Sequence, residues 1–245
     1  MKDVMIKADK LSKTFRIPHE KRDSLKKSFV NLLKKKTYTE NCVLRDISFE
    51  VYSGEFYGII GRNGSGKSTL LKILAGIYTY DSGELEINGS VSPFLELGVG
   101  FNPDLTGREN VYLNGAILGL SQKEIDSKYD EIVEFSELSE FMDQRLRNYS
   151  SGMQVRLAFA VAIHAHAPII LLDEVLAVGD LAFQEKCSKI FIDMKKEGKT
   201  IVFVSHDMYS MERFCDRILL IEAGRVVDVD VPKKIIPKFK KILGV

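Results

Sequence analysis

The sequence predicts an α/β fold: a mainly parallel sheet flanked by helices, with an all-helical segment inserted into it. Short apolar runs typical of buried strands alternate with stretches of helical spacing, as in other parallel sheets. A glycine-rich segment joins the first of these strands to the helix that follows it. The expected buried strands are residues 55–60, 169–172 and 200–204, and the expected helices of the sheet are residues 68–74 and 183–196.

The remaining elements divide the chain into a core and an insertion. Strands are expected at residues 4–8, 47–51 and 84–87, and a hairpin at residues 218–222 and 225–229. Helical spacing recurs over residues 110–118, 122–135 and 151–164, and Ser121 with Glu124 forms a capping box for the second helix. We therefore expect one domain over residues 1–245, with a core and antiparallel β subdomain at 1–95 and 166–230, a helical subdomain at 96–165 and a C-terminal tail at 231–245.

The composition is that of a globular protein, with 45% hydrophobic and 28% charged residues among 245. The formal net charge of +1 lacks the basic excess of nucleic-acid-binding proteins, so no nucleic-acid partner is expected. Three scattered cysteines show no disulfide or metal spacing, as is usual in a reducing cytosol. No signal peptide is evident, and no apolar run reaches the roughly 20 residues that span a bilayer. We expect a cytoplasmic protein that meets a membrane only through a partner.

The glycine-rich segment from Gly61 to Ser68 fits the pattern G-x-x-x-x-G-K-[ST] of a phosphate-binding loop. Glycines let the backbone N–H groups turn toward phosphate oxygens, and the following helix presents its positive end to the same anion. Lys67 is expected to reach the β- and γ-phosphates and Ser68 to ligate Mg²⁺. The alternative is a glycine-rich surface turn. The expected ATP contacts are Gly61, Arg62, Asn63, Gly64, Ser65, Gly66, Lys67, Ser68 and Thr69.

Two acidic residues and one histidine follow the next buried strands. Asp173 is expected to hold the Mg²⁺ shell and Glu174 to act as general base on the attacking water. His206 is expected to donate to the γ-phosphate, and so to distinguish ATP from ADP. Taken alone, each of these residues also fits a structural role at a strand end.

The segment Tyr-Ser-Ser-Gly-Met at 149–153, just before a helix, resembles the signature motif of the ABC transporter family. Together with the phosphate loop, Asp173-Glu174, Ala-Val-Gly-Asp at 177–180 and Ser-His-Asp at 205–207, it covers nearly the whole chain in the family's order. The resemblance implies an ABC-type P-loop NTPase with a RecA-like core, and an ATPase that works as a homodimer. Two subunits would sandwich two ATP molecules, each between the phosphate loop of one and the signature of the other. By this resemblance Ser150, Ser151, Gly152 and Asp180 face the partner's nucleotide, and Phe15 stacks on adenine.

Departures from the family's common pattern indicate one branch of it. Tyr149, Ser151 and Met153 replace the usual leucine, glycine and glutamine, and the stretch 94–110 lacks the usual glutamine, with Glu96 as the nearest replacement metal ligand. These features resemble ATPase subunits that export O-antigen, capsule or teichoic acid. That branch implies an integral-membrane permease partner, a lipid-linked polysaccharide substrate and a place on the cytoplasmic face of the cell membrane. Some O-antigen members carry a carbohydrate-binding domain after the ATPase. Because the sequence stops at Val245, we expect either a member of the shorter type or a piece of a longer protein.

One alternative is an ABC ATPase of another exporter type. Two other functions fit the motifs less well. A soluble ABC ATPase acting on ribosomes or DNA is expected to carry two cassettes or long coiled coils, and neither pattern occurs in the sequence. A regulatory protein without hydrolysis is expected to lack some of the catalytic residues, which are intact here. An amphipathic basic helix is also expected at residues 23–36, either packed on its own domain or facing the permease, anionic headgroups or the substrate.

Overall fold

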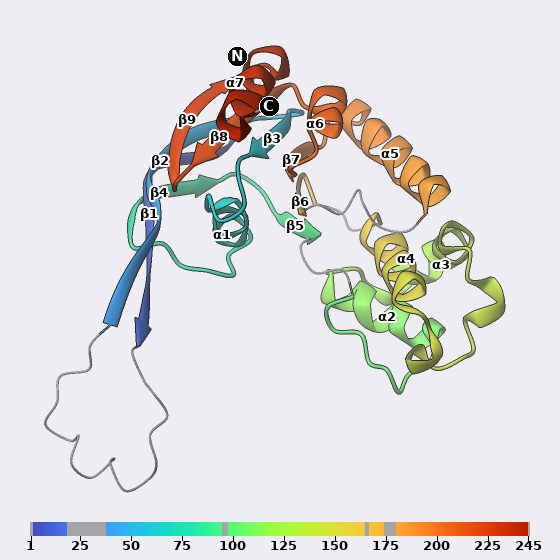
Figure 1. Cartoon of the computed structure of the whole chain (residues 1–245). Coiled ribbons are helices and arrows are strands. Elements are labelled where there is room, and N and C mark those ends of the chain that lie inside the picture. Colours follow the sequence, from blue (N-terminus) through green and yellow to red (C-terminus); the bar gives the residue numbers. More distant parts are fainter. Residues whose placement is uncertain (1, 19–37, 95–97, 165–166, 174–179, 245) are drawn as a thin grey trace, which may run out of the picture.

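The computed structural model describes residues 2–18, 38–94, 98–164, 167–173 and 180–244. It has two sheets and a group of helices that stands to one side of them (Figure 1). The smaller sheet is antiparallel, with strand order β2–β1–β4. Its strands are β1 (Val4–Pro18), β2 (Tyr38–Tyr52) and β4 (Ser82–Ile87).

The larger sheet has six strands in the order β5–β6–β7–β3–β8–β9. All neighbouring pairs are parallel except β8 with β9, which form an antiparallel hairpin. Every residue of β3 and β7 is buried, as expected for strands covered on both faces. The strands are β3 (Phe56–Ile60), β5 (Val91–Phe94), β6 (Ile169–Asp173), β7 (Thr200–Val204), β8 (Arg217–Glu222) and β9 (Arg225–Asp230).

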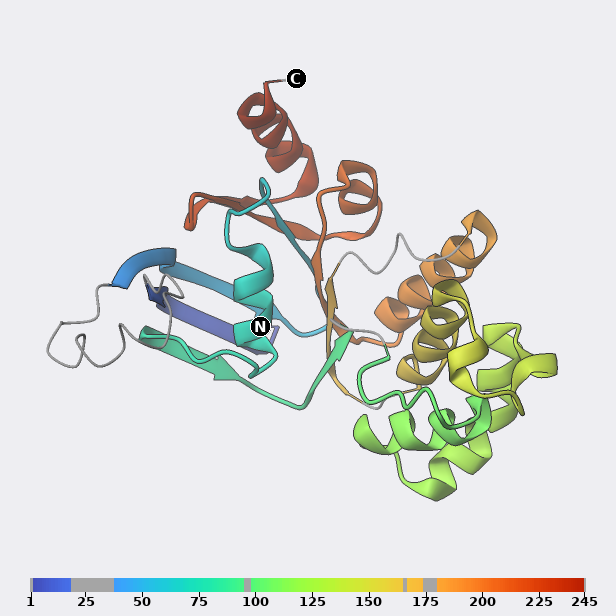
Figure 2. The same ribbon diagram turned by 60° about the horizontal axis from the view of Figure 1, so that its bottom comes forward.

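Helix α1 (Lys67–Leu74) lies between the two sheets, as Figure 2 shows. Its buried Leu70, Leu71 and Leu74 share one hydrophobic cluster with residues of both sheets. The opposite face of the six-stranded sheet is covered by α5 (Leu181–Lys196), α6 (Met208–Phe214) and α7 (Pro232–Leu243). The phosphate loop is therefore anchored at both ends by packed elements, β3 before it and α1 after it.

The inserted helices are α2 (Gly107–Ile117), α3 (Gln122–Ser136) and α4 (Ser151–Ala162), with short 3-10 helices at Ser139–Phe141 and Leu146–Asn148. They have a hydrophobic cluster of their own. Capping boxes begin both α2, at Thr106 with Glu109, and α3, at Ser121 with Glu124. The expected α/β core with a helical insertion is thus confirmed, and so is the expected cap of α3.

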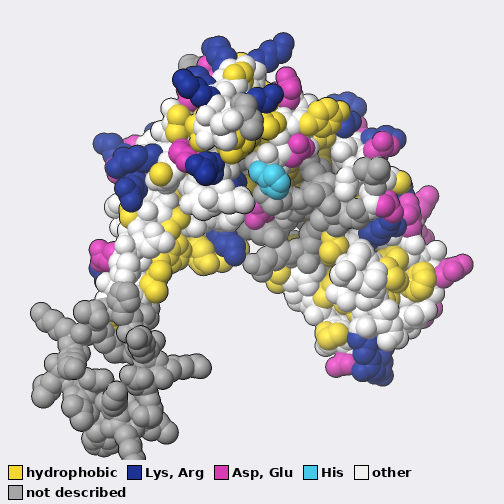
Figure 3. Space-filling view, viewed as in Figure 1, with side chains coloured by type: hydrophobic (Ala, Val, Ile, Leu, Met, Phe, Trp, Pro, Cys, Tyr) yellow, Lys and Arg dark blue, Asp and Glu magenta, His cyan; other side chains and the backbone are white. Residues whose placement is uncertain are grey.

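Three elements were not predicted from the sequence: β5, α6 and α7. The segment expected as a tail forms α7, which buries Ile235, Ile236 and Phe239 on the core and leaves its lysines exposed (Figure 3). Strands β1 and β2 also run further than expected into the basic stretch, pairing as far as Pro18 with Tyr38. The predicted helix at 23–36 lies outside the described residues. Among the described helices, none has the length and apolarity needed to cross a membrane.

Candidate functional site

The glycine-rich loop at 61–66 leaves the end of β3 and leads directly into α1. A Cβ on Gly61 would lie 2.1 Å from the carbonyl oxygen of Ile221 and 2.6 Å from the hydroxyl of Ser65, so the chain itself requires glycine there. Gly66 has φ of 107° and stands at the N-cap of α1 without any side-chain cap. The loop therefore brings an uncapped helix N-terminus to the surface, the arrangement that favours bound anions.

Lys67, the first residue of α1, carries a buried positive charge next to this loop. The residue is only 6% exposed, and its Nζ donates to the carbonyl oxygens of Gly61 at 2.8 Å and Arg62 at 3.1 Å. Close by, the Ser65 hydroxyl is buried and has no hydrogen-bond partner within the described residues. A buried polar atom without a partner is uncommon and often marks the place of a ligand or water.

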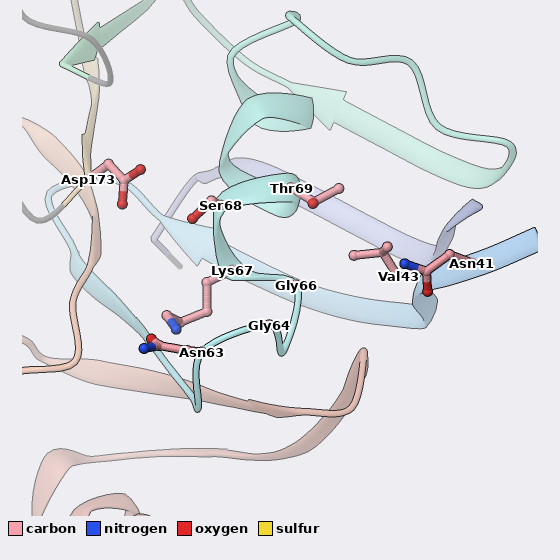
Figure 4. A pocket seen from close by; sticks show the side chains of 9 residues that line it. All are labelled: Asn41, Val43, Asn63, Gly64, Gly66, Lys67, Ser68, Thr69 and Asp173. Atoms are coloured by element: carbon pink, nitrogen blue, oxygen red, sulfur yellow. The ribbon is translucent and has the colours of Figure 1, made fainter. Parts of the chain in front are cut away.

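A cavity of about 550 Å³ opens in front of the loop, a volume within the usual range for small-molecule sites. Figure 4 shows Lys67, Ser68 and Asp173 toward one end of it, Asn41 and Val43 at the other, and Thr69 between them. The cavity is thus polar and charged at one end and lined by β2 at the other. Its lining residues are Asn41, Val43, Asn63, Gly64, Gly66, Lys67, Ser68, Thr69 and Asp173.

Asp173 is the last residue of β6 and pairs in register with Val204 of β7. Its half-buried side chain and the exposed Ser68 both supply oxygen atoms to the same end of the cavity. His206 follows two residues after Val204 and is exposed. It lines a neighbouring cavity of about 510 Å³ together with residues of α6 and α7. Because parallel strands end at one edge of a sheet, His206 still emerges on the same edge as Asp173.

Phe15 lies beside the other end of the cavity. It is the cross-strand partner of Asn41, and directly paired residues of an antiparallel ladder project on the same face. Its ring meets Tyr78 edge-on at 5.6 Å, and the Nζ of Lys13 lies 5.5 Å from its centroid. Asp81 braces this arrangement, since its carboxylate accepts from the backbone N–H of Thr14 at 2.6 Å and from Lys13 Nζ at 3.0 Å. The half-buried Phe15 ring is therefore held in place beside the end of the cavity that β2 lines.

The signature-like segment forms the exposed N-terminus of α4. Ser150 is the N-cap, and its hydroxyl accepts from the backbone N–H of Met153 at 3.2 Å. A Cβ on Gly152 would meet nothing closer than the Ser150 hydroxyl, at 3.8 Å, so no contact within the chain requires glycine. In both ribbon views α4 stands apart from α1, so this helix end does not reach the chain's own phosphate loop (Figures 1 and 2).

Two more motif residues have structural partners in the chain. Tyr149 is buried, and its hydroxyl donates to the carbonyl oxygen of Phe141 at 2.7 Å. A Cβ on Gly107 would lie 2.2 Å from that hydroxyl, so Tyr149 fits because Gly107 has no side chain. Asp180 is the N-cap of α5 and accepts from the backbone N–H of Phe183 at 2.9 Å, a bond that lowers the pKa of its carboxyl.

A family model described as ABC transporter matches residues 44–177, which include the phosphate loop, the signature-like segment and Asp173. The chain belongs to the ABC transporter family. Its structure also resembles the dimeric post-hydrolysis state of the ATP-binding cassette MJ0796 bound to ADP and Pi, with a TM-score of 0.74, 25% identity and coverage of 93% of this chain and 99% of that one.

Curated relatives of this ABC cassette are export proteins. It is 49% identical to the O-antigen export system ATP-binding protein RfbB of Myxococcus xanthus, over 82% of this chain and 46% of that protein. It is 47% identical to RfbB of Klebsiella pneumoniae, over 87% and 85%. It is 43% identical to the teichoic acids export ATP-binding protein TagH of Enterococcus faecalis, over 99% and 54%. The chain thus spans about half the length of two of these relatives, and the expected resemblance to the polysaccharide-export branch is confirmed.

The residues of the cassette fit ATP with Mg²⁺. The uncapped start of α1, the buried Lys67 and the Ser65 hydroxyl, which has no partner among the described residues, suit a phosphate group. Ser68 and Asp173 offer the hard oxygen ligands that Mg²⁺ prefers. Within the described part of the chain no group of three or more histidine, cysteine or acidic side chains gathers. Mg²⁺ does not need one, because it is usually held by one or two carboxylates and the phosphates themselves.

Motif reading missed two lining residues, Asn41 and Val43. No local pattern marks them, because they reach the cavity through the pairing of β2 with β1 across a long segment. The structure brings together the phosphate-loop residues and Asp173 and sets Phe15 beside them. Ser150, Ser151 and Gly152 lie in the helical subdomain, and Asp180 lies at the start of α5 in the core. Glu96 and Glu174 lie outside the described residues.

Proposed function

We propose that this cassette hydrolyses ATP to drive export of a lipid-linked polysaccharide, of O-antigen, capsule or teichoic-acid type, through a separate membrane permease. The observation that carries the ATPase part is the cavity in which Lys67, Ser68 and Asp173 meet. The polysaccharide part is supported by the printed functions of the relatives, which are O-antigen and teichoic acid export.

In the proposed reaction, each residue of the site handles a different part of MgATP. Lys67 and the N–H groups at the start of α1 hold the β- and γ-phosphates and offset their charge as the terminal bond breaks. Ser68 and Asp173 would hold Mg²⁺, which withdraws charge from the phosphate oxygens when it is bound. Glu174 takes the proton of the attacking water, and His206 donates to the γ-phosphate. Phe15 stacks on adenine, and Asn41 lies at the same end of the cavity as Phe15.

The proposed active unit is a homodimer with two shared sites. The exposed start of α4 offers N–H groups and the Ser150 hydroxyl, but in a region that does not reach its own phosphate loop. A two-fold axis would place this helix end against the γ-phosphate held by the partner. The same symmetry places the partner's helix end against the γ-phosphate of this chain, so both ATP sites are completed together. The structurally similar MJ0796 cassette is a dimer with ADP and Pi, which supports this arrangement. Binding to the permease would hold the pair at the cytoplasmic face of the cell membrane.

The test has a biochemical and a cellular arm. The purified chain should hydrolyse ATP with added Mg²⁺ and stop when EDTA removes the metal. In cells that lack the native protein, the wild-type chain should restore surface polysaccharide, while Lys67→Ala should leave lipid-linked polymer inside. ATPase activity without restored export would contradict the transport part alone. Mg²⁺-independent hydrolysis, or none, would contradict the assigned site.

A further inference from the structure

Three helices of the cassette meet at one guanidinium. Arg156, in the second turn of α4, contacts the Oε2 of Glu137 through one terminal nitrogen at 2.9 Å. Its other terminal nitrogen contacts the Oδ2 of Asp180 at 2.5 Å. Its guanidinium carbon also lies 5.0 Å from the ring centroid of Phe183 in α5. The Arg156 side chain is only 19% exposed, so it is far more enclosed than a usual surface ion pair.

Both acidic partners are themselves held in place. Glu137 is the C-cap of α3 and has φ of 60°, a left-handed conformation that non-glycine residues rarely adopt. Its second carboxylate oxygen pairs with Lys186 of α5. Asp180 caps α5 at the same time as it pairs with Arg156. We call these four residues, Glu137, Arg156, Asp180 and Lys186, the Arg156 cluster.

The Arg156 cluster joins the helical subdomain to the core. Glu137 and Arg156 belong to the inserted helices, whereas Asp180 and Lys186 belong to α5, which packs on the six-stranded sheet. In Figure 3, acidic and basic side chains lie together where the start of α5 meets the helical subdomain. Two positive and two negative charges balance there. A planar guanidinium that bonds two carboxylates fixes direction as well as distance, which a lysine ammonium cannot do.

The two helices joined by Arg156 are connected to different nucleotide sites in the proposed dimer. Ser150, six residues before Arg156 on the same helix, would contact the ATP held by the partner. Asp180 starts the helix that follows Asp173 along the chain, and Asp173 lines the chain's own ATP cavity. A rotation of α4 relative to α5 would therefore move one half-site relative to the other.

We propose that Arg156 is a positioning residue that sets the start of α4 at the angle needed to close on the partner's ATP. This inference rests on the proposed homodimer. Arg156 is not one of the residues that line the ATP cavity. Its two carboxylate contacts hold the signature segment against the core. The helix is then already oriented before the dimer forms, so association loses less free energy to ordering it.

The test separates nucleotide binding by one subunit from closure of the pair. Arg156→Gln keeps part of the aliphatic stem but removes the charge, and Arg156→Lys keeps the charge but lacks the planar fork that bonds the two carboxylates through separate nitrogens. Arg147→Gln is the matched control, because Arg147 pairs with Asp104 inside the helical subdomain alone, at 3.3 Å. Each change is made in the full chain with Glu174→Gln, so that ATP persists. A fluorescent ATP analogue reports binding, and analytical ultracentrifugation reports ATP-dependent dimers.

With Arg156→Gln we expect nucleotide affinity within twofold of the parent and dimer affinity at least tenfold weaker. Arg156→Lys should lie between the two, and Arg147→Gln should match the parent in both measurements. Equal dimer affinity in Arg156→Gln and Arg147→Gln would overturn the proposal, as would parallel losses of nucleotide binding and dimerisation. If Arg156→Gln fails to fold, Glu137→Gln, which leaves the Arg156–Asp180 pair, should still show a selective loss of dimers. A parent chain that never dimerises with ATP would instead overturn the proposed function and the inference with it.

Discussion

The starts of α1 and α4 both contain glycine. Only at α1 do contacts within the chain explain why a glycine is needed. At α1, the carbonyl oxygen of Ile221 leaves no room for a side chain at Gly61, and the positive charge of Lys67 is buried beside the same loop. At α4, Ser150 is exposed and Gly152 has open space where a side chain would go. The first is a pocket that one chain completes. The second is exposed, and we propose that it is a contact surface for another chain.

The largest expected effect comes from removing the proposed general base, Glu174. Glu174→Gln should keep ATP binding but lower hydrolysis by about 10² or more, since a positioned base typically contributes that much. Steady-state phosphate release and equilibrium ATP binding, measured on the same sample, check this. Turnover near the wild-type rate would show that another group activates the water.

The next effect concerns the buried charge of the pocket. Lys67→Ala should weaken ATP binding by about tenfold or more, because hydrogen bonds to charged groups contribute about 1.5–3 kcal/mol. Isothermal titration with ATP measures the change. The control is Lys196→Ala, on the exposed side of α5 in an ion pair with Asp193. Equal affinities of the two variants would argue against Lys67 as a phosphate ligand.

Two glycine substitutions compare the helix starts directly. Gly61→Ala should lower the free energy of unfolding by about 3 kcal/mol, because its Cβ would collide with the Ile221 carbonyl. Gly152→Ala should leave that free energy unchanged or raise it by up to about 1 kcal/mol, since alanine is the better helix former. Its ATPase activity should nevertheless fall, because the added methyl faces the proposed partner. Urea unfolding and ATPase assays of both variants test the contrast, which a fully active Gly152→Ala would remove.

The smallest expected effect is at the end of the cavity where adenine is proposed to stack on Phe15. Asn41→Ala should weaken ATP binding by roughly two- to tenfold, the usual range for one neutral hydrogen bond. Thr39→Ala is the control, because Thr39 projects on the same face of β2 but does not line the cavity. If the Asn41 amide meets the ribose, its effect should shrink with 2′- or 3′-deoxy-ATP. Identical affinities for both variants would leave Asn41 without a role in binding.

How far the sequence predicted the molecule differs between its parts. The phosphate loop, the strand before Asp173 and the hairpin of β8 with β9 are local patterns, so residues close in sequence were enough. Helix α7 was missed although Ile235, Ile236 and Phe239 have helical spacing, because Pro237 inside it reads as a helix breaker. Asn41 and Arg156 were missed because their partners come from distant segments: Phe15 for one, and Glu137 and Asp180 for the other.

The central claim is that each ATP site combines the phosphate loop of one chain with the α4 start of another. Mixing two variants tests it most directly, with Lys67→Ala disabling the pocket and Ser150→Arg disabling the exposed helix start. In a mixed pair, one site contains both changes and the other contains neither. Since the doubly changed site binds little ATP, the added arginine has room there.

The measurement is ATPase activity of each variant alone and of an equimolar mixture. Each alone should be nearly inactive, and the mixture should regain up to about a quarter of wild-type activity, because half of randomly formed two-fold pairs are mixed and each has one intact site. A mixture no more active than the average of its two components would contradict the shared site, and so would full activity of Ser150→Arg by itself.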